Sequence, residues 1–224
     1  MSLSRSWQFV GSNEGVPYRV YDWLRRRLNG RLVAFLAEHL PESSSNNASP
    51  AIWSLEAGSG TAFASSLFQS QRRVAGSVCL DLDETALREA KRRDPKLHAV
   101  VADISHMPFA PESFALVFNN STVEHLDDPT VAVTEMQRVC RSDGRVFVGV
   151  PYLFGPLAFQ PLIGKTSIGV WLGPVFSRAA LYAVMNRAGL TPLTSIRFFW
   201  NFFVGAVAAK TNAPQTGSVA GVER

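Results

Sequence analysis

The stretch Leu55-Glu56-Ala57-Gly58-Ser59-Gly60-Thr61-Ala62 decides the fold of this chain. Apolar residues 51–55 lead into it and residues 61–71 continue from it with helical spacing, a pattern typical of a turn from a strand into a helix. The two glycines of the stretch allow a ligand to approach the backbone of the turn. Asp81 ends the next apolar run, where an acid accepts hydrogen bonds from ribose hydroxyls. Together these features predict a site for a nucleotide-type ligand.

Short apolar runs alternate with helical patterns along the rest of the chain. The runs expected to form strands are 51–55, 76–80, 98–101, 114–119, 145–150, 191–197 and 202–208, and the expected helices are 61–71, 84–93, 130–140 and 177–186. Because this alternation implies right-handed crossovers, it predicts an α/β fold: a Rossmann-like, doubly wound, mostly parallel seven-stranded sheet with helices on both faces. Ligands of such sheets bind at the carboxyl ends of the strands.

Three parts are expected: an N-terminal helical cap and linker at 1–50, the main domain at 51–209 and a flexible tail at 210–224. Gly30 is expected to divide two helices of the cap or to bend one. Prolines and Lys165 interrupt the apolar stretch 151–176, which predicts a lid over the active site rather than a membrane span. Asp143-Gly144 is expected to form the turn into the fifth strand, and Asp83 to cap a helix.

The composition is that of a globular domain, with 46% hydrophobic and 18% charged residues. Cys79 and Cys140 lie in apolar runs without zinc-ligand or disulfide-framework spacing, so both are expected in the core. The first residues lack the apolar run of a secretory signal, which predicts a cytoplasmic location. The net charge is +4, and residues 144–222 contain no acidic side chain. This last third of the chain is basic and apolar. It contributes either an ordinary solvated surface and part of the core, or a surface for an anionic or lipid-like partner.

Two positions separate the expected ligand from a dinucleotide. The third glycine of the dinucleotide fingerprint packs the helix close to the pyrophosphate, and Phe63 stands at that position. Phe63 therefore disfavours NAD and FAD. Glu56 places a carboxylate at the turn, which suits the cationic ligand S-adenosylmethionine (SAM) better than a phosphate.

Ordered motifs in the chain resemble those of the class I SAM-dependent methyltransferase superfamily, in the branch that includes ubiquinone, menaquinone and many small-molecule methyltransferases. They are Leu55–Thr61, Leu80–Asp83, Ala102–Phe109, Ser113–Val117, Thr122–Leu126 and Glu135–Gly144. Ala62 and Ala115 depart from the family pattern, since glycine and aspartate are common at these positions. Neither change removes an essential ligand contact. The resemblance implies methyl transfer from SAM, with S-adenosylhomocysteine as the product.

The resemblance also implies which residues bind the cofactor. It places Glu56 near the methionine end of SAM, Gly58 and Gly60 against its backbone, Asp81 on the ribose, Asp103 and Ile104 at the adenine, and Asn119 near the amino acid moiety. Ala57, Ser59 and Leu82, which lie next to these residues, are also expected to bind the cofactor. Each acid also has a structural interpretation. Asp81 and Asp103 could be ordinary helix-cap or turn carboxylates, and Glu56 could be a salt-bridged structural acid.

His125 is the candidate catalytic residue. It follows the fourth strand, where an acceptor would meet the methyl group, and an imidazole accepts protons near neutral pH. The alternative is a structural Glu124-His125 pair, which is common in this family. A metal ion is not expected, because Ser121 stands where a further acid would help to hold it.

The sequence leaves the methyl acceptor open among three classes. A small, apolar or lipid-like molecule comes first, because of the aromatic cluster 198–203 and the absence of acids from 144–222, and a peripheral membrane contact goes with it. RNA comes second, on the sequence pI of about 9.4 and the basic clusters 25–27, 72–73 and 91–93. A non-catalytic SAM-fold binding protein is the third class. The oligomeric state is not indicated.

Overall fold

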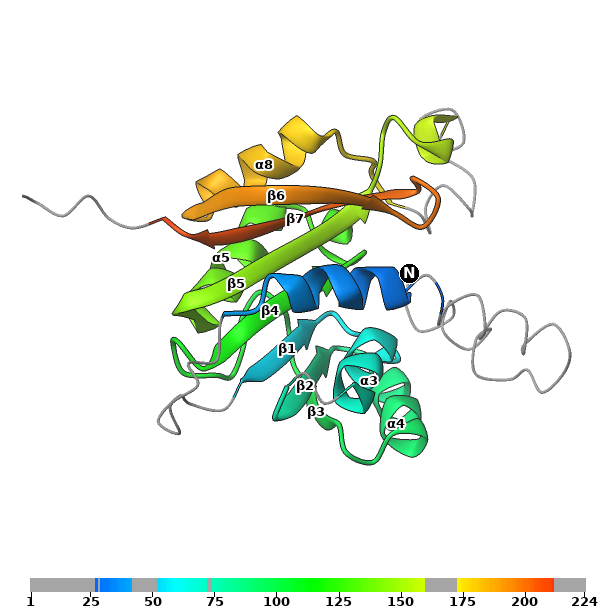
Figure 1. Ribbon diagram of the computed structural model, residues 1–224, viewed down its shortest axis with the longest axis vertical. Coiled ribbons are helices and arrows are strands. Elements are labelled where there is room, and N and C mark those ends of the chain that lie inside the picture. The colour runs from blue at the N-terminus through cyan, green and yellow to red at the C-terminus, as the bar shows by residue number, and fades with distance from the viewer. Residues whose placement is uncertain (1–26, 28, 42–51, 72–73, 160–172, 212–224) are drawn as a thin grey trace, which may run out of the picture.

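A computed structural model describes residues 27, 29–41, 52–71, 74–159 and 173–211 (Figure 1). Its strands are β1 (Trp53–Ala57), β2 (Gly76–Asp81), β3 (His98–Val101), β4 (Phe114–Asn120), β5 (Cys140–Pro151), β6 (Leu190–Phe198) and β7 (Phe203–Lys210). Its helices are α3 (Phe63–Ser70), α4 (Glu84–Arg93), α5 (Pro129–Val139) and α8 (Arg178–Arg187), with the short 3-10 helices η1 (Val123–His125) and η2 (Pro156–Phe159). An N-terminal helix includes residues 27 and 29–38.

The strands form one seven-stranded sheet in the order β3-β2-β1-β4-β5-β7-β6. Strands β1 to β5 pair in parallel, and β7 pairs antiparallel with both β5 and β6. The strand order reverses between β1 and β4, and such a switch point is where open α/β sheets bind ligands. The predicted Rossmann-like fold is therefore confirmed, and its expected binding edge is at the carboxyl ends of β1, β2 and β4.

The helix ends follow local capping rules. The Asp83 carboxylate accepts hydrogen bonds from the backbone N–H groups of Thr85 and Ala86, and α4 ends with Lys91, Arg92 and Arg93, which suit the negative end of the helix dipole. The Ser177 hydroxyl accepts a hydrogen bond from the Ala180 N–H at the start of α8. The predicted bounds of α4 and the predicted cap at Asp83 are confirmed. They could be predicted because the residues that cap a helix lie next to it in the sequence.

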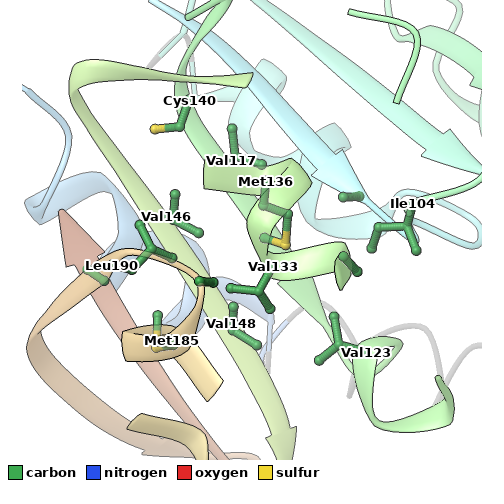
Figure 2. Packing of buried hydrophobic residues seen from close by; sticks show 14 of the residues in the cluster. Ile104, Val117, Val123, Val133, Met136, Cys140, Val146, Val148, Met185 and Leu190 are labelled. Atoms are coloured by element: carbon green, nitrogen blue, oxygen red, sulfur yellow. The ribbon is translucent and has the colours of Figure 1, made fainter. Parts of the chain in front are cut away.

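Helices α5 and α8 cover one face of the sheet. Figure 2 shows Val133 and Met136 of α5 packed against Val117, Val146 and Val148 of β4 and β5. Met136 and Val133 have no exposed surface. This apolar layer fixes α5 beneath β4 and β5, and it thereby fixes the position of η1 at the carboxyl end of β4.

The N-terminal helix and α3 cover the other face (Figure 1). Leu32 and Leu36 of the N-terminal helix belong to the same buried cluster as Phe118 of β4 and Phe147 of β5. Gly30 lies inside the helical run 29–38, so the prediction that it divides two helices is wrong. Packing of the leucines on the sheet outweighs the weak helix preference of one glycine.

Two predicted boundaries need correction because strand pairing overrides local signals. Asp143 and Gly144 lie within β5, in residues 141–144, which face a single residue of β4 where the register shifts between Phe114 and Leu116. They are not a turn before the strand. Likewise β1 covers Trp53–Ala57 rather than 51–55, since its pairing with β2 continues to Ala57.

Several predicted segments lie outside the described residues. These are most of the cap and linker before residue 52, the centre of the expected lid at 160–172 and the tail from 212. Residues 151–159 and 173–176 of the lid stretch are described. Phe176 forms an isolated bridge with Tyr152, so the two ends of the stretch lie side by side.

Glycine substitutions test the packing of the sheet. A Cβ on Gly205 of β7 would collide with the buried Phe147 ring. Gly205→Ala is therefore expected to lower the free energy of unfolding by about 1–3 kcal/mol, the scale of overpacking in a core. Gly30→Ala adds the same methyl group where nothing lies within 4 Å, and it is expected to stabilise the chain by about 0.5–1 kcal/mol. Urea unfolding measures both values, and equal effects of the two substitutions would contradict this packing.

Candidate active site

The turn between β1 and α3 is the centre of the candidate site. The backbone N–H groups of Gly58 and Ser59 both donate hydrogen bonds to the Leu80 carbonyl at the end of β2, at 2.8 and 2.9 Å. Gly58 has φ 69°, and a Cβ there would collide with the Thr122 side chain. Gly60 has φ 51°, also in the left-handed region. Backbone conformation thus favours glycine at both positions, and at 58 the close Thr122 side chain leaves no space for a Cβ.

Ala62 shows what the departure from the family pattern means physically. This residue has φ 50°, a left-handed conformation that costs a residue with a Cβ about 1–2 kcal/mol. Ala62 is fully buried and stands at the N-cap of α3 without a side-chain hydrogen bond. The change therefore affects backbone strain and leaves the ligand-facing part of the turn at Gly58 and Gly60 intact.

Asp81 lies at the carboxyl end of β2 and is oriented by backbone donors. One carboxylate oxygen accepts a hydrogen bond from the Gly60 N–H at 2.7 Å, and the other accepts one from the Asp83 N–H at 2.9 Å. The carboxylate is only partly buried. Because a carboxylate has about four acceptor positions, the two backbone bonds leave Asp81 able to accept two hydroxyl donors of a ligand.

Glu56 is buried beneath the turn. Its Oε2 accepts hydrogen bonds from the Ser65 hydroxyl at 2.6 Å and from the Ser65 N–H at 2.9 Å. This pair ties β1 to α3, so Glu56 has a structural contact in addition to its predicted place near the cofactor. The sequence pattern does not single out Ser65, because a serine within a helical run carries no signal of its partner.

The end of β4 is tied to the same turn. The buried Asn119 side chain donates from Nδ2 to the Ala57 carbonyl at 2.6 Å. The Thr122 hydroxyl donates to the Gly58 carbonyl at 3.0 Å. Asn119 thus lies beside the turn, as its predicted role requires, while its described partners are backbone groups. Thr122 is a second residue whose contact with the turn the sequence motif alone does not reveal.

The predicted adenine residues follow β3. The Asp103 carboxylate accepts a hydrogen bond from the Ser105 N–H at 2.7 Å, which closes a local turn, and Ile104 is buried in the core. The Ala102 N–H donates to the Asp81 carbonyl, so this turn is joined to the end of β2. Leu82, next to Asp81, exposes 65% of its surface. A large apolar side chain exposed at this edge can cover one face of a ligand.

Glu124 and His125 lie on η1, directly after β4. Glu124 Oε1 accepts a hydrogen bond from the Ser121 hydroxyl at 2.6 Å and lies 3.9 Å from His125 Nε2. Burial raises the pKa of Glu124 to about 7, while the Ser121 hydrogen bond acts in the opposite direction. Burial also lowers the pKa of His125. The imidazole is therefore neutral at physiological pH and can accept a proton.

Within residues 27, 29–41, 52–71, 74–159 and 173–211, no group of three or more His, Cys, Asp and Glu side chains is placed to hold a metal ion. Within the same ranges, no helix has the length and apolar character needed to cross a membrane.

Comparison with known proteins agrees with this geometry. Residues 55–148 match the model of a methyltransferase domain. A malonyl-[acyl-carrier protein] O-methyltransferase of Hamiltonella defensa is 34% identical over 111 residues, 49% of this chain and 40% of that protein. A demethylmenaquinone methyltransferase of Renibacterium salmoninarum is 30% identical over 115 residues, 51% of this chain and 44% of that protein. Residues 55–148 of the chain are therefore similar to class I SAM-dependent methyltransferases.

A solved methyltransferase has the same fold. Geranyl diphosphate C-methyltransferase from Streptomyces coelicolor A3(2) superposes with a TM-score of 0.64 at 16% identity, covering 90% of this chain and 86% of that one. At this identity the likeness concerns the fold alone. The chain also spans less than half the length of the two relatives above, 40% and 44%.

The raised pKa of Glu124 makes the stability of the chain depend on pH. Between the ordinary value of 4.5 and about 7, the folded chain holds a proton on Glu124 that the unfolded chain has lost. As the pH rises through that range, the deprotonation of Glu124 should therefore lower the free energy of unfolding by roughly 3 kcal/mol.

Glu124→Gln isolates the effect, because glutamine is neutral at every pH. Urea unfolding of both proteins from pH 4 to pH 8 should show the stability of the native chain falling relative to that of the variant. A difference that stays constant with pH would contradict the burial of an ionisable group at this position.

Proposed function

We propose that this chain is a SAM-dependent methyltransferase that transfers a methyl group to a small, apolar or lipid-like acceptor. The observation that supports it most is the orientation of Asp81: the Gly60 N–H binds its carboxylate at the switch point of the sheet. SAM supplies an already activated methyl group when bound. The chain therefore has to align cofactor and acceptor more than it has to activate them.

In this proposal the residues that contact the cofactor lie at the carboxyl ends of four strands, β1, β2, β3 and β4. Gly58 and Gly60 let its methionine part lie against the backbone, with Glu56 and Asn119 beneath it. Asp81 accepts hydrogen bonds from the ribose hydroxyls, and Leu82 covers the sugar. Asp103 and Ile104 border the adenine. The proposed domain unit is the same as the predicted one, residues 51–209.

Phe63 supports SAM over a dinucleotide. Its ring is buried at the first residue of α3, and the Arg93 guanidinium lies over the ring at 5.2 Å from the ring centroid. A dinucleotide turn needs a glycine at this position so that the helix can pack close to the pyrophosphate. This chain has a buried phenylalanine ring there in place of a glycine hydrogen.

If the methyl acceptor is a hydroxyl group, His125 is the residue proposed to take up its proton. Its side chain keeps 29% of its surface exposed at the carboxyl edge of the sheet. Because burial lowers its pKa, the ring is in the neutral form that takes up a proton.

The surroundings of the site favour an apolar acceptor. Phe154, just after β5, exposes 71% of its surface, and Trp200, between β6 and β7, exposes 62%. Gly155 packs against the Asn201 carbonyl, so the segments that carry these two rings adjoin at the carboxyl edge of the sheet. The relatives named for malonyl-[acyl-carrier protein] and demethylmenaquinone also favour an acceptor outside the nucleic acids. Most of the aromatic cluster 198–203 packs internally, with the ring centroids of Phe198 and Phe203 5.6 Å apart.

RNA is the weaker alternative because the basic cluster 91–93 has intramolecular partners. Lys91 donates to the carbonyls of Pro95 and Leu97 at 2.7 Å, and Arg92 donates to Glu89. The Arg93 guanidinium donates to the Thr61 carbonyl. These bonds compete with phosphate contacts. A cytoplasmic location and a peripheral membrane contact are part of the proposal.

Calorimetry tests the cofactor assignment. SAM and S-adenosylhomocysteine should bind, and NAD should not. Asp81→Ala should weaken SAM binding by about 1.5–3 kcal/mol, the range for hydrogen bonds to a charged group. Asp83→Ser keeps a helix-capping side chain two residues away and should leave SAM affinity unchanged. Unchanged affinity in Asp81→Ala, or an equal loss in both variants, would contradict the ribose assignment.

A labelled-methyl screen tests the acceptor. The purified chain is incubated with methyl-labelled SAM and separate pools of lipids, quinones, phenols, amines and RNA. Label is expected in an apolar small-molecule pool, and His125→Asn should lower the rate about 100-fold if the acceptor is a hydroxyl. Label confined to RNA or to cationic amines would refute the apolar acceptor.

A further inference from the structure

Glu124 is a buried carboxyl group to which the proposed function assigns no contact with the cofactor. Its side chain has no exposed surface, and Ser121 binds only one of its oxygens. Within the described part of the chain the other oxygen, Oε2, has no hydrogen-bond partner. Burying a carboxyl group with an unsatisfied oxygen costs free energy, so such a group at the edge of a binding site calls for a functional reason.

The position of His125 supplies that reason. Its Nε2 lies 3.9 Å from Glu124 Oε1. Gly173 closes over both side chains: a Cβ on this glycine would lie 2.7 Å from His125 Cε1 and 3.1 Å from Glu124 Cγ. The imidazole and the carboxyl group are thus held together between η1 and the chain at Gly173. One part of the ring remains exposed toward solvent.

Ser121 fixes the carboxyl group in this pair. Ser121 has φ 64°, a left-handed conformation that is strained for a residue with a Cβ, and its N–H donates to the Gly149 carbonyl of β5. That conformation accompanies the 2.6 Å hydrogen bond from its hydroxyl to Glu124. The strain is thus located where the carboxyl group is held.

The elements packed against η1 bring no unscreened charged side chain to the pair formed by Glu124 and His125. The facing part of β5, Val146–Pro151, has only apolar residues and glycine. Helix α5 begins after Asp128, whose exposed carboxylate caps the helix through the Thr130 N–H. Asp127 is exposed as well. Water screens both aspartates, whereas the Glu124 carboxyl group has no exposed surface and the side chain of its neighbour His125 is 29% exposed.

We propose that Glu124 is a positioning residue that forms a proton-sharing pair with His125. The inference rests on the proposed function. As the methyl carbon–sulfur bond breaks and a bond from that carbon to the acceptor oxygen forms, the hydroxyl proton of the acceptor passes to His125. The Glu124 carboxylate stabilises the resulting imidazolium. The proton returns to water after the product leaves, and the electron pair of the broken bond stays on sulfur.

The titration of His125, followed by the NMR signal of its carbon-bound ring proton in the full chain, tests the pair without any substrate. Strongly coupled groups release their protons in two macroscopic steps that belong to the pair. The native His125 signal is therefore expected to show two inflections. In Glu124→Gln it should show one, about 1 pH unit below the upper native inflection, because a carboxylate at this distance favours the charged imidazole.

Asp127→Asn is the matched control, since it removes the same charge two residues from His125 and should keep both inflections. A single inflection in the native chain overturns the proposal even if Glu124→Gln does not fold. The same titration curve in the native chain and in Glu124→Gln, or loss of the second step in Asp127→Asn, overturns it as well. Calorimetry with SAM on the native chain separates the two ideas, because absence of SAM binding refutes the proposed function and leaves the titration result standing.

Discussion

The backbone of the turn between β1 and α3 is held from both neighbouring strands, and the candidate site depends on this arrangement. From the β2 side, the Leu80 carbonyl and the Asp81 carboxylate accept hydrogen bonds from the N–H groups of residues 58–60. From the β4 side, Asn119 and Thr122 donate to carbonyls of the turn. The turn is therefore rigid before any ligand binds, so little ordering entropy remains to oppose binding.

Much of the fold is encoded locally, which is why the sequence predicts it. The order of strands and helices follows from periodicity, and Asp83 caps α4 through its nearest backbone groups. Local sequence does not place Gly30 inside one helical run, nor Asp143-Gly144 within a strand. Their turn preference is weaker than the packing of a helix on the sheet and the pairing of β5 with β4, and neither of these is visible in a short stretch of sequence.

In the candidate site, too, some features can be predicted from the sequence and others depend on tertiary packing. Asp81 could be predicted, because parallel strands end at one edge of the sheet and the acid ends the strand next to the glycine turn. The Glu56–Ser65 bond and the burial of Glu124 could not be predicted, since they depend on which side of a strand or helix faces the core. Spacing places Glu56 at the turn, and only the packed structure gives it a partner in α3.

The central claim is that the carboxyl edge of β1, β2 and β4 is a SAM site organised by Asp81. A crystal structure of the chain with S-adenosylhomocysteine bound tests this most directly. The account predicts both ribose hydroxyls within hydrogen-bond distance of the Asp81 carboxylate, with the adenine beside Asp103 and Ile104 and the homocysteine part against Gly58. Density for the ligand at another place on the sheet, or a ribose that Asp81 does not contact, would contradict it.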